Sequence, residues 1–391
     1  MTKLEQLIKE LCPNGVDYKK LQYLAEISTG SSNTNEAIEG GKYPFFVRSQ
    51  ELLYKDEYEF DETAIITAGD GVGVGKVLHF YSGKYSLHQR AYRIHITDKG
   101  LLSKFFYFYM QSTFYDYITK AGFHSSVSSI RRPMLNNYPV PVPPIEVQAE
   151  IVKILDNFTE LTAELTAELT ARKKQYEYYR DLLLDFGVHG GGTSECEWRT
   201  LGEIFDIRNG YTPSKSNAEY WENGTVPWFR MDDIRENGRI LSSAMQKVTM
   251  QAVKNKPFPA NSIIISTSAT IGEHALITVD FMSNQRFSCL SLKKEFKSKF
   301  NMMFVFYYCF ILSKYCSENL NQSSFASVDM SKFYSFSFPI IPIEEQERIV
   351  SILDRFDKLC NDISEGLPAE IEARRKQYEY YRDKLLSFRP K

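Results

Sequence analysis

The longest regular pattern in the chain is a stripe of apolar residues between residues 148 and 186, spaced three or four positions apart with charges between them. This spacing places the apolar side chains on one face of an amphipathic helix. About forty residues of helix would make a rod of roughly 60 Å. A second stripe runs from 345 to 388, where Gly366 and Pro368 predict a break or kink. The apolar positions that we expect to join the helices or set their spacing are Ile151, Phe158, Leu161, Leu165, Leu169, Tyr176, Tyr179 and Leu183, then Ile349, Phe356, Leu359, Ile363, Tyr378, Tyr381 and Leu385.

The two stripes belong to an internal repeat that runs through the whole chain. The sequence ARKKQYEYYRD at 171–181 returns with one conservative change at 373–383, and PIEVQ at 144–148 returns as PIEEQ at 342–346. A weaker repeat precedes each stripe: Gly30 matches Gly210, and His88-Gln89-Arg90 matches Asn284-Gln285-Arg286. The chain therefore holds two related globular domains, each followed by a helix. Because matching stripes can bury each other, we expect an antiparallel coiled coil with pseudo-two-fold symmetry.

Proline-rich runs at 139–144 and 339–342 precede the helices and mark the domain ends, since proline stops regular structure. The glycine-rich segment 187–192 is the expected flexible exit from the first helix. The predicted divisions are a first globular domain with a short N-terminal helix (1–144), a central helix (145–189), a second globular domain (190–342) and a C-terminal helix (343–391).

Length and charge narrow the class of protein. At 391 residues the chain is too long for one ordinary domain. It has 47 Lys and Arg residues and 49 Asp and Glu residues. The chain therefore lacks the net positive charge of a protein that binds DNA phosphates without partners. The six cysteines form no CxxC pair, which favours reduced thiols over zinc or disulfides. The most apolar stretch, 302–312, is too short to span a bilayer, and we expect a soluble cytoplasmic protein with no membrane partner.

The first stripe contains a short tandem repeat. Residues 161–170 read LTAELTAELT, so the unit TAEL occurs twice in succession. A generic solvated helix surface would explain leucine at this spacing. Four helical residues, however, add about 6 Å and about 40° of rotation, close to the turn of one base pair. A helix built from such units can act as a ruler.

In these motifs the chain resembles the specificity subunit of Type I restriction-modification systems, especially the group with TAEL repeats in the central helix. The resemblance covers essentially the whole chain, and it is specific because the order, spacing and duplication of the motifs agree. The sequence departs from the family pattern at Pro368, which does not fit a continuous second helix. The resemblance implies an α/β (α+β) fold with two homologous mixed α/β target-recognition domains separated by the two long helices. Each domain would read one half of a split asymmetric site in double-stranded DNA, and the helices would set the gap.

The same resemblance implies partners for this chain and no chemistry of its own. Two modification (adenine methyltransferase) subunits would dock on the helices, and restriction/translocase subunits would join them to form the nuclease. S-adenosylmethionine, ATP and magnesium would be bound by those partners. We therefore expect no catalytic residue, no metal and no cofactor in this chain.

DNA reading calls for Arg, Lys, Asn, Gln, Ser and Thr on the loops of rigid domains, because these side chains match base edges and phosphates. For any single position, a capped turn or solvated surface residue is the simpler explanation. In the first domain the expected contacts are Arg48, Ser49, Gln50, Asp70, His88, Gln89, Arg90, Ser125, Ser126, Ser128, Arg131 and Arg132. In the second domain they are Tyr211, Thr212, Lys215, Arg230, Ser266, Thr267, Ser268, Thr270, Asn284, Gln285, Arg286, Gln322, Ser323 and Ser324.

Two enzymatic interpretations do not fit the sequence. The glycine-rich segment 69–76 departs from a Walker A loop, because Asp70 stands where glycine is required and Val77 where Ser or Thr is required. A DNA methyltransferase acting alone needs Pro-Pro followed by an aromatic residue, whereas Pro143-Pro144 precedes Ile145. A coiled-coil adaptor that does not bind DNA remains the alternative. The near-neutral charge favours it, and the divergence of the two globular regions counts against it.

Overall fold

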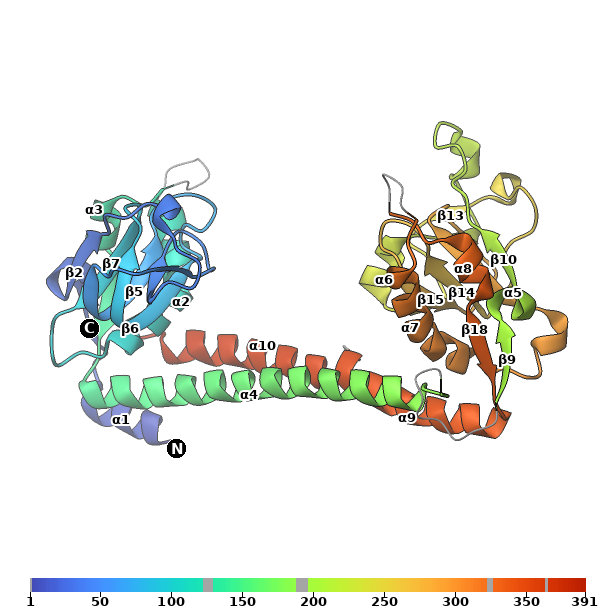
Figure 1. Cartoon of the computed structure of the whole chain (residues 1–391). Helices are drawn as coiled ribbons and strands as arrows, with labels where there is room; N and C mark the ends of the chain where they lie inside the picture. Colours follow the sequence, from blue (N-terminus) through green and yellow to red (C-terminus); the bar gives the residue numbers. More distant parts are fainter. Residues whose placement is uncertain (1, 122–128, 188–195, 322–325, 363–364) are drawn as a thin grey trace. The chain divides into compact units, whose positions relative to one another are not determined.

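The computed structural model describes residues 2–121, 129–187, 196–321, 326–362 and 365–391. The chain forms two compact units: unit 1 is Met1–Glu168 with Ala369–Lys391, and unit 2 is Leu169–Pro368 (Figure 1). The predicted glycine-rich exit lies outside the described residues from 188 onward. Seven predicted side chains also lie outside them: Ser125, Ser126, Ser128, Gln322, Ser323, Ser324 and Ile363.

Unit 1 is built on a six-stranded sheet with the order β2-β7-β5-β6-β3-β4. These strands are β2 (Ala25–Thr29), β3 (Tyr43–Phe46), β4 (Leu53–Lys55), β5 (Phe60–Ala68), β6 (Leu78–Leu87) and β7 (Ala91–Ile96). Helix α2 (Ser103–Ala121) packs against β5 and β6 and buries the aromatic residues Phe105, Phe106 and Phe114. The remaining elements of unit 1 before the long helix are α1 (Lys3–Leu11), β1 (Asp17–Lys20), η1 (Leu21–Tyr23), η2 (Thr34–Glu36), α3 (Arg132–Asn136) and β8 (Pro139–Val142).

Unit 2 contains a five-stranded sheet of order β10-β17-β14-β15-β12 and a three-stranded sheet of order β13-β11-β16. The strands are β10 (Phe205–Asn209), β11 (Val226–Phe229), β12 (Ile240–Leu241), β13 (Lys247–Val248), β14 (Ser262–Ser266), β15 (His274–Ile277), β16 (Met282–Ser283) and β17 (Phe287–Leu292). Helix α7 (Met302–Glu318) packs against β15 and buries the run Phe304–Cys309 together with Leu312 and Cys316. The shorter elements are β9 (Glu197–Thr200), α5 (Leu201–Ile204), η3 (Ala218–Tyr220), α6 (Met231–Asn237), η4 (Met250–Ala252), η5 (Lys294–Phe296), α8 (Met330–Ser335) and β18 (Ser337–Ile340).

The sequence repeat is also a structural repeat. The order β2-β7-β5-β6 of unit 1 corresponds to β10-β17-β14-β15 of unit 2. Ile94 lies opposite Ile27 and Ile65, and Leu290 lies in the same way opposite Ile207 and Ile263. A two-stranded sheet accompanies each, β1 with β8 and β9 with β18. The predicted fold class, two homologous mixed α/β domains with long helices, is confirmed.

The glutamine of the PIExQ motif joins each globular sheet region to its helix. Gln148 accepts a hydrogen bond from the Leu102 N–H (2.9 Å) and donates one to the Pro143 carbonyl (2.7 Å). Gln346 accepts from the Asn301 N–H (2.8 Å) and donates to the Ile341 carbonyl (2.9 Å). Both side chains are fully buried, so their amides satisfy backbone groups that water cannot reach. This role explains why the motif occurs twice.

The long helices pack in pairs inside each unit. Helix α4 (Ile145–Leu183) crosses the boundary between the units, α9 (Ile343–Asn361) lies in unit 2, and α10 (Leu367–Leu385) lies almost wholly in unit 1. In unit 1 the Phe158 ring stacks on Tyr381 at 5.6 Å, and in unit 2 the Phe356 ring stacks on Tyr179 at 5.9 Å.

Helix α4 packs antiparallel to α10 in unit 1. Ile151 and Leu155, near the start of α4, share a core with Leu386, just past the end of α10. Several predicted contact positions are nonetheless open to solvent, since Leu161 is 36% and Leu359 39% exposed. The apolar stripes therefore retain exposed surface.

The predicted break in the second helical segment is confirmed. Helix α9 ends at Asn361 and α10 begins at Leu367, with Pro368 in its first turn. A Cβ atom on Gly366 would approach the Lys358 and Asp362 carbonyl oxygens to 2.6 and 2.7 Å, so only glycine fits this bend. No helix in the described part of the chain is long and apolar enough to cross a membrane.

Candidate nucleic-acid interface

One polar turn occurs at the same place in both units. It directly follows β6 in unit 1 and β16 in unit 2, and these strands pair in parallel with β3 and β11 respectively. In unit 1 the turn is His88-Gln89-Arg90, and the His88 Nδ1 accepts a hydrogen bond from the Arg90 N–H (3.0 Å). In unit 2 it is Asn284-Gln285-Arg286, and the Asn284 Oδ1 accepts from the Arg286 N–H (3.0 Å). Burial and the nearby Arg48 charge lower the pKa of His88, which keeps the acceptor nitrogen unprotonated. Different side chains thus cap an equivalent backbone turn.

A glycine places a second polar loop against each turn. A Cβ on Gly30 would overlap the Leu87 carbonyl, and one on Gly210 would overlap the Ser283 carbonyl. These carbonyls directly precede the two turns, so the close approach requires glycine in both units.

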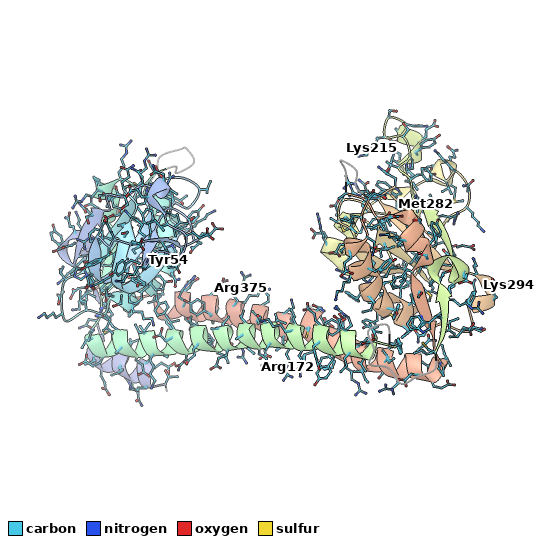
Figure 2. The ribbon with its side chains drawn as sticks, in the orientation of Figure 1. Tyr54, Arg172, Lys215, Met282, Lys294 and Arg375 are labelled. Carbon is cyan, nitrogen blue, oxygen red and sulfur yellow. The ribbon has the colours of Figure 1, made fainter. Side chains whose placement is uncertain are left out.

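The loops that follow these glycines contact the glutamines of the turns. Gln89 Nε2 donates to Asn33 Oδ1 (2.5 Å), and Thr212 donates to Gln285 Oε1 (2.5 Å). Lys215 lies further along the second loop, exposed to solvent and distant from the sheet (Figure 2).

The loop that follows β5 in unit 1, and the loop that follows β14 in unit 2, complete the cluster. The Gly69 N–H donates to the Arg90 carbonyl (2.8 Å), and the Thr267 N–H donates to the Arg286 carbonyl (3.0 Å). A Cβ on Gly69 would meet that Arg90 carbonyl oxygen. Glycine in segment 69–76 therefore allows close backbone packing within this cluster.

Unit 1 holds a carboxylate between two arginines. Asp70 accepts from Arg48 (2.7 Å) and from Arg90 (3.1 Å) through different oxygens. Burial alone would raise the pKa of Asp70, but the hydrogen bonds and charges of the two arginines together lower it. The arginine side chains remain 40% and 61% exposed, so each guanidinium keeps donors free for a ligand.

An open cavity of about 420 Å³ adjoins this ion-pair cluster. Three of its lining residues, Asn33, Thr34 and Asn35, are absent from the predicted set. Their position after Gly30, equivalent to the predicted polar loop after Gly210, is the signal that would have found them. The other lining residues are the predicted Arg48, His88, Gln89 and Arg90.

Unit 2 has no carboxylate at the equivalent position. Asp70 bridges to Ser129 and Ser268 bridges to Ser327, which makes Ser268 the counterpart of Asp70. Arg230 follows β11, stacks at 5.8 Å over Trp228 and lies 3.4 Å from Asp232. Its Nε is buried and has no hydrogen-bond partner among the described residues.

Several predicted readers use their polar groups inside the protein. Tyr211 donates its hydroxyl to the Ala252 carbonyl and accepts from the Lys254 N–H. Ser266 is fully buried and donates to the Ser268 carbonyl, and Arg132 donates to the Ile27 carbonyl (2.6 Å). The other predicted positions outside the cluster are surface or loop residues: Ser49, Gln50, Arg131 and Thr270. No group of three or more potential metal ligands occurs in the described part of the chain.

Comparisons with known proteins agree with the repeat. A family model described as the Type I restriction modification DNA specificity domain matches residues 13–172 and again residues 193–373. The chain is 55% identical over 219 residues to the Type I restriction enzyme EcoprrI specificity subunit of Escherichia coli, covering 54% of this chain and 53% of that protein. It is 43% identical over 281 residues to the EcoR124I/EcoR124II specificity subunit of Escherichia coli, covering 66% of each protein. These alignments span about half and just under two thirds of the relatives' lengths.

A solved structure shows the same fold. It comes from work on complex assembly and conformational transition of the type I R-M system, and it aligns with a TM-score of 0.67 and 15% identity. The alignment covers 96% of this chain and 98% of the other.

Proposed function

The chain belongs to the family of Type I restriction-modification DNA specificity proteins, and from this premise we propose that it is a non-catalytic DNA sequence-specificity subunit. Each unit would read one half of a bipartite asymmetric site in double-stranded DNA. The observation that carries this proposal is the polar turn cluster present in both units. The backbone hydrogen bonds of the two clusters match, whereas His88 and Asp70 of unit 1 are replaced by Asn284 and Ser268 in unit 2. A shared backbone arrangement that carries different side chains in the two units suits the recognition of two different half-sites.

The side chains of the clusters suit base recognition. Arginine pairs with guanine, and asparagine or glutamine pairs with adenine, through two hydrogen bonds in the major groove. Unit 1 offers Arg48 and Arg90 with Gln89 and Asn33, and unit 2 offers Arg286 with Gln285. These four side chains of unit 1 line one open cavity, which supports their proposed role as readers.

Partners would supply what this chain lacks. A formal net charge of −2 supports weak phosphate binding, so most of the backbone grip would come from other subunits. We propose that two modification subunits dock on the long helices and that restriction/translocase subunits join them in the cytoplasm. S-adenosylmethionine, ATP and magnesium would be held by those subunits, consistent with the specificity-subunit names of the E. coli relatives.

The test is to express the chain with the methyltransferase subunit of its own system and to map methylated adenines by single-molecule sequencing. We expect a split asymmetric motif that disappears when this chain is omitted. Methylation that does not depend on the chain, or a continuous motif, would refute two-headed recognition and favour the non-DNA-binding adaptor.

A further inference from the structure

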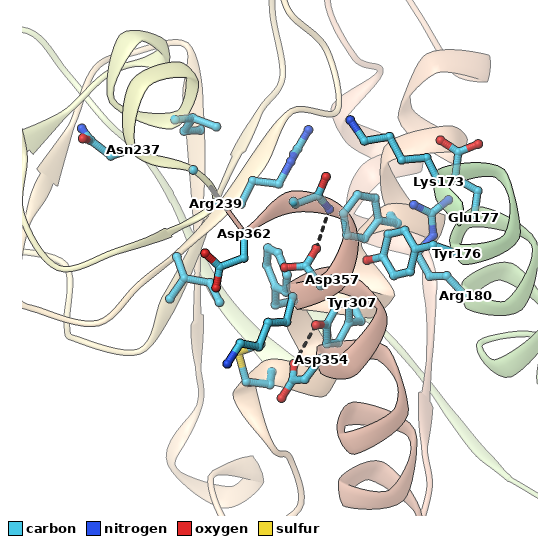
Figure 3. Close-up of a pocket in the computed structure, with 18 residues that line it drawn as sticks. Lys173, Tyr176, Glu177, Arg180, Asn237, Arg239, Tyr307, Asp354, Asp357 and Asp362 are labelled. Carbon is cyan, nitrogen blue, oxygen red and sulfur yellow. Dashed lines mark hydrogen bonds between the residues drawn. The ribbon is translucent and has the colours of Figure 1, made fainter. Parts of the chain in front are cut away.

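A cavity of about 920 Å³ lies within unit 2, bordered by α4, α7, α9 and the turn after α6 (Figure 3). Tyr176 of α4, Tyr307 and Phe310 of α7, and Asp354 and Asp357 of α9 line it. It is separate from the polar turn cluster, and none of these five residues is a predicted DNA reader. Comparison with unit 1 shows that two polar groups of this region are missing in unit 2.

The first missing group is a lysine. In unit 1, Lys104 at the start of α2 forms an ion pair with Asp156 of α4, with 2.7 Å between Nζ and Oδ1. The repeat places Asp354 at the position of Asp156 and Met303 at that of Lys104.

The repeat glutamines fix this alignment. Leu102 and Asn301 donate their N–H groups to Gln148 and Gln346 respectively, one residue before α2 and α7 begin. Asp354 accepts a hydrogen bond from the Tyr307 hydroxyl (2.6 Å) but forms no ion pair within the described residues.

The second missing group is an amide. In unit 1 the Tyr378 hydroxyl donates to Gln111 Oε1 (3.1 Å). The matching tyrosine of unit 2 is Tyr176, and Phe310 occupies the position of Gln111. Tyr176 is only 6% exposed, and its hydroxyl has no partner among the described residues. Figure 3 shows this hydroxyl directed into the cavity, where a ligand could satisfy it.

The charges around the cavity favour a positive ligand. The basic side chains that line it are already paired with carboxylates of other positions: Arg180 with Asp181 (2.8 Å), Arg239 with Glu273 (2.5 Å) and Lys358 with Glu365 (2.5 Å). Lys173 is the exception, because it forms no ion pair with any residue that the structure describes.

By contrast, the two α9 carboxylates that line the cavity accept hydrogen bonds from neutral groups. Asp354 accepts from Tyr307 and Asp357 accepts from Asn361 (2.9 Å). Each carboxylate can accept further hydrogen bonds, because its two oxygens offer about four lone-pair sites. Burial raises the pKa of Asp357, and an added cation would relieve this effect.

We propose that this cavity binds the lysine or arginine side chain of a modification subunit docked on the helices of unit 2. This inference rests on the proposed function. The entering cation would take the place that Lys104 fills in unit 1, donating to Asp354 and Asp357 and to the Tyr176 oxygen. Unit 1 supplies its own lysine, so the two docking sites for modification subunits are not equivalent.

The decisive variant is Met303→Lys, which gives unit 2 the internal lysine of unit 1. Affinity for the modification subunit is measured by titration, and the number of bound copies by native mass spectrometry. We expect one of two bound copies to be lost or weakened at least tenfold while the other is unchanged. Asp354→Asn should have the same effect, because it removes the charge without changing volume. Asp156→Asn is the matched control in unit 1 and should leave both copies bound.

Thermal unfolding of each variant separates loss of docking from loss of folding. Where Met303→Lys proves to be destabilised, the binding measured with Asp354→Asn tests the proposal. Two copies bound with wild-type affinity to both unit 2 variants would overturn the inference while leaving the proposed function intact. A wild-type chain that binds no modification subunit would instead overturn the proposed docking function together with this inference.

Discussion

The residues of the two turn clusters differ mainly in charge. Asp70 fixes two arginines in unit 1, whereas Ser268 stands at the equivalent position in unit 2. If this cluster contacts DNA as proposed, the Asp70 carboxylate would repel phosphates, and Arg48 and Arg90 beside it would contact base edges instead. We infer that Asp70 acts as a positioning residue for both guanidinium groups.

Replacing Asp70 by Asn should release Arg48 and Arg90 from their fixed orientation. We expect relaxed discrimination at one or two base pairs of one half-site, by about 1–3 kcal/mol for each lost base contact. The methylated motif of the variant, compared with the wild-type motif, is the measurement. The other half-site serves as an internal control, and a variant with an unchanged motif would show that Asp70 does not position the readers.

Sequence reasoning located these clusters only where the repeat marked them. The triplets 88–90 and 284–286 can be paired from the sequence because both contain Gln-Arg, and in the structure they form equivalent turns. Asn33 was missed because the loops after Gly30 and Gly210 share no identical polar residue. The sequence predicts Ser266 as a reader although its side chain is buried, because a linear pattern does not reveal the direction of a side chain.

Among the elements, the PIExQ motif makes the most specific contact. Gln346→Ala would remove hydrogen bonds to Asn301, Lys299 and Ile341 and leave their backbone groups buried without partners. We expect a loss of roughly 2–4 kcal/mol in the free energy of unfolding, measured by urea denaturation. Glu345→Ala is the neighbouring control, since its exposed pair with Arg348 contributes at most about 1 kcal/mol. Equal losses in both variants would contradict this role.

The tandem TAEL segment of α4 offers a test of spacing. Inserting one more unit after Leu169 should widen the gap of the methylated motif by about one base pair, because four helical residues add about 6 Å and about 40°. Inserting two residues should abolish recognition, since it rotates the following helix by about 200°. An unchanged gap after the four-residue insertion would exclude the helix as a spacer.

The helices were the most predictable elements, because long apolar stripes and a closely spaced glycine and proline, Gly366 and Pro368, carry strong local signals. The break between Asn361 and Leu367 appeared where Gly366 and Pro368 predicted it. The order of strands within each sheet was not predictable, because pairings such as β3 with β6 join residues far apart in sequence.

In the whole molecule, unit 1 takes residues from both ends of the sequence. The Val16 N–H donates to the Arg389 carbonyl (2.9 Å), and the Lys391 N–H donates to the Val16 carbonyl (3.1 Å). Divisions drawn along the chain, such as 1–144 and 343–391, separate the last helix from the sheet region that it completes. A sequence repeat identifies matching segments, but it does not show which segments pack together in one hydrophobic core.

Because unit 1 combines two distant segments of the sequence and unit 2 is one continuous segment, the two units are completed at different times during synthesis. All of unit 2, Leu169–Pro368, leaves the ribosome as one uninterrupted segment and can fold while translation continues. The first segment of unit 1 is made before unit 2, but unit 1 lacks Ala369–Lys391 until those residues emerge. Ile151 and Leu155, which share a core with Leu386, therefore stay without this partner on the nascent chain. The half of the protein that is translated first is therefore the half that is completed last.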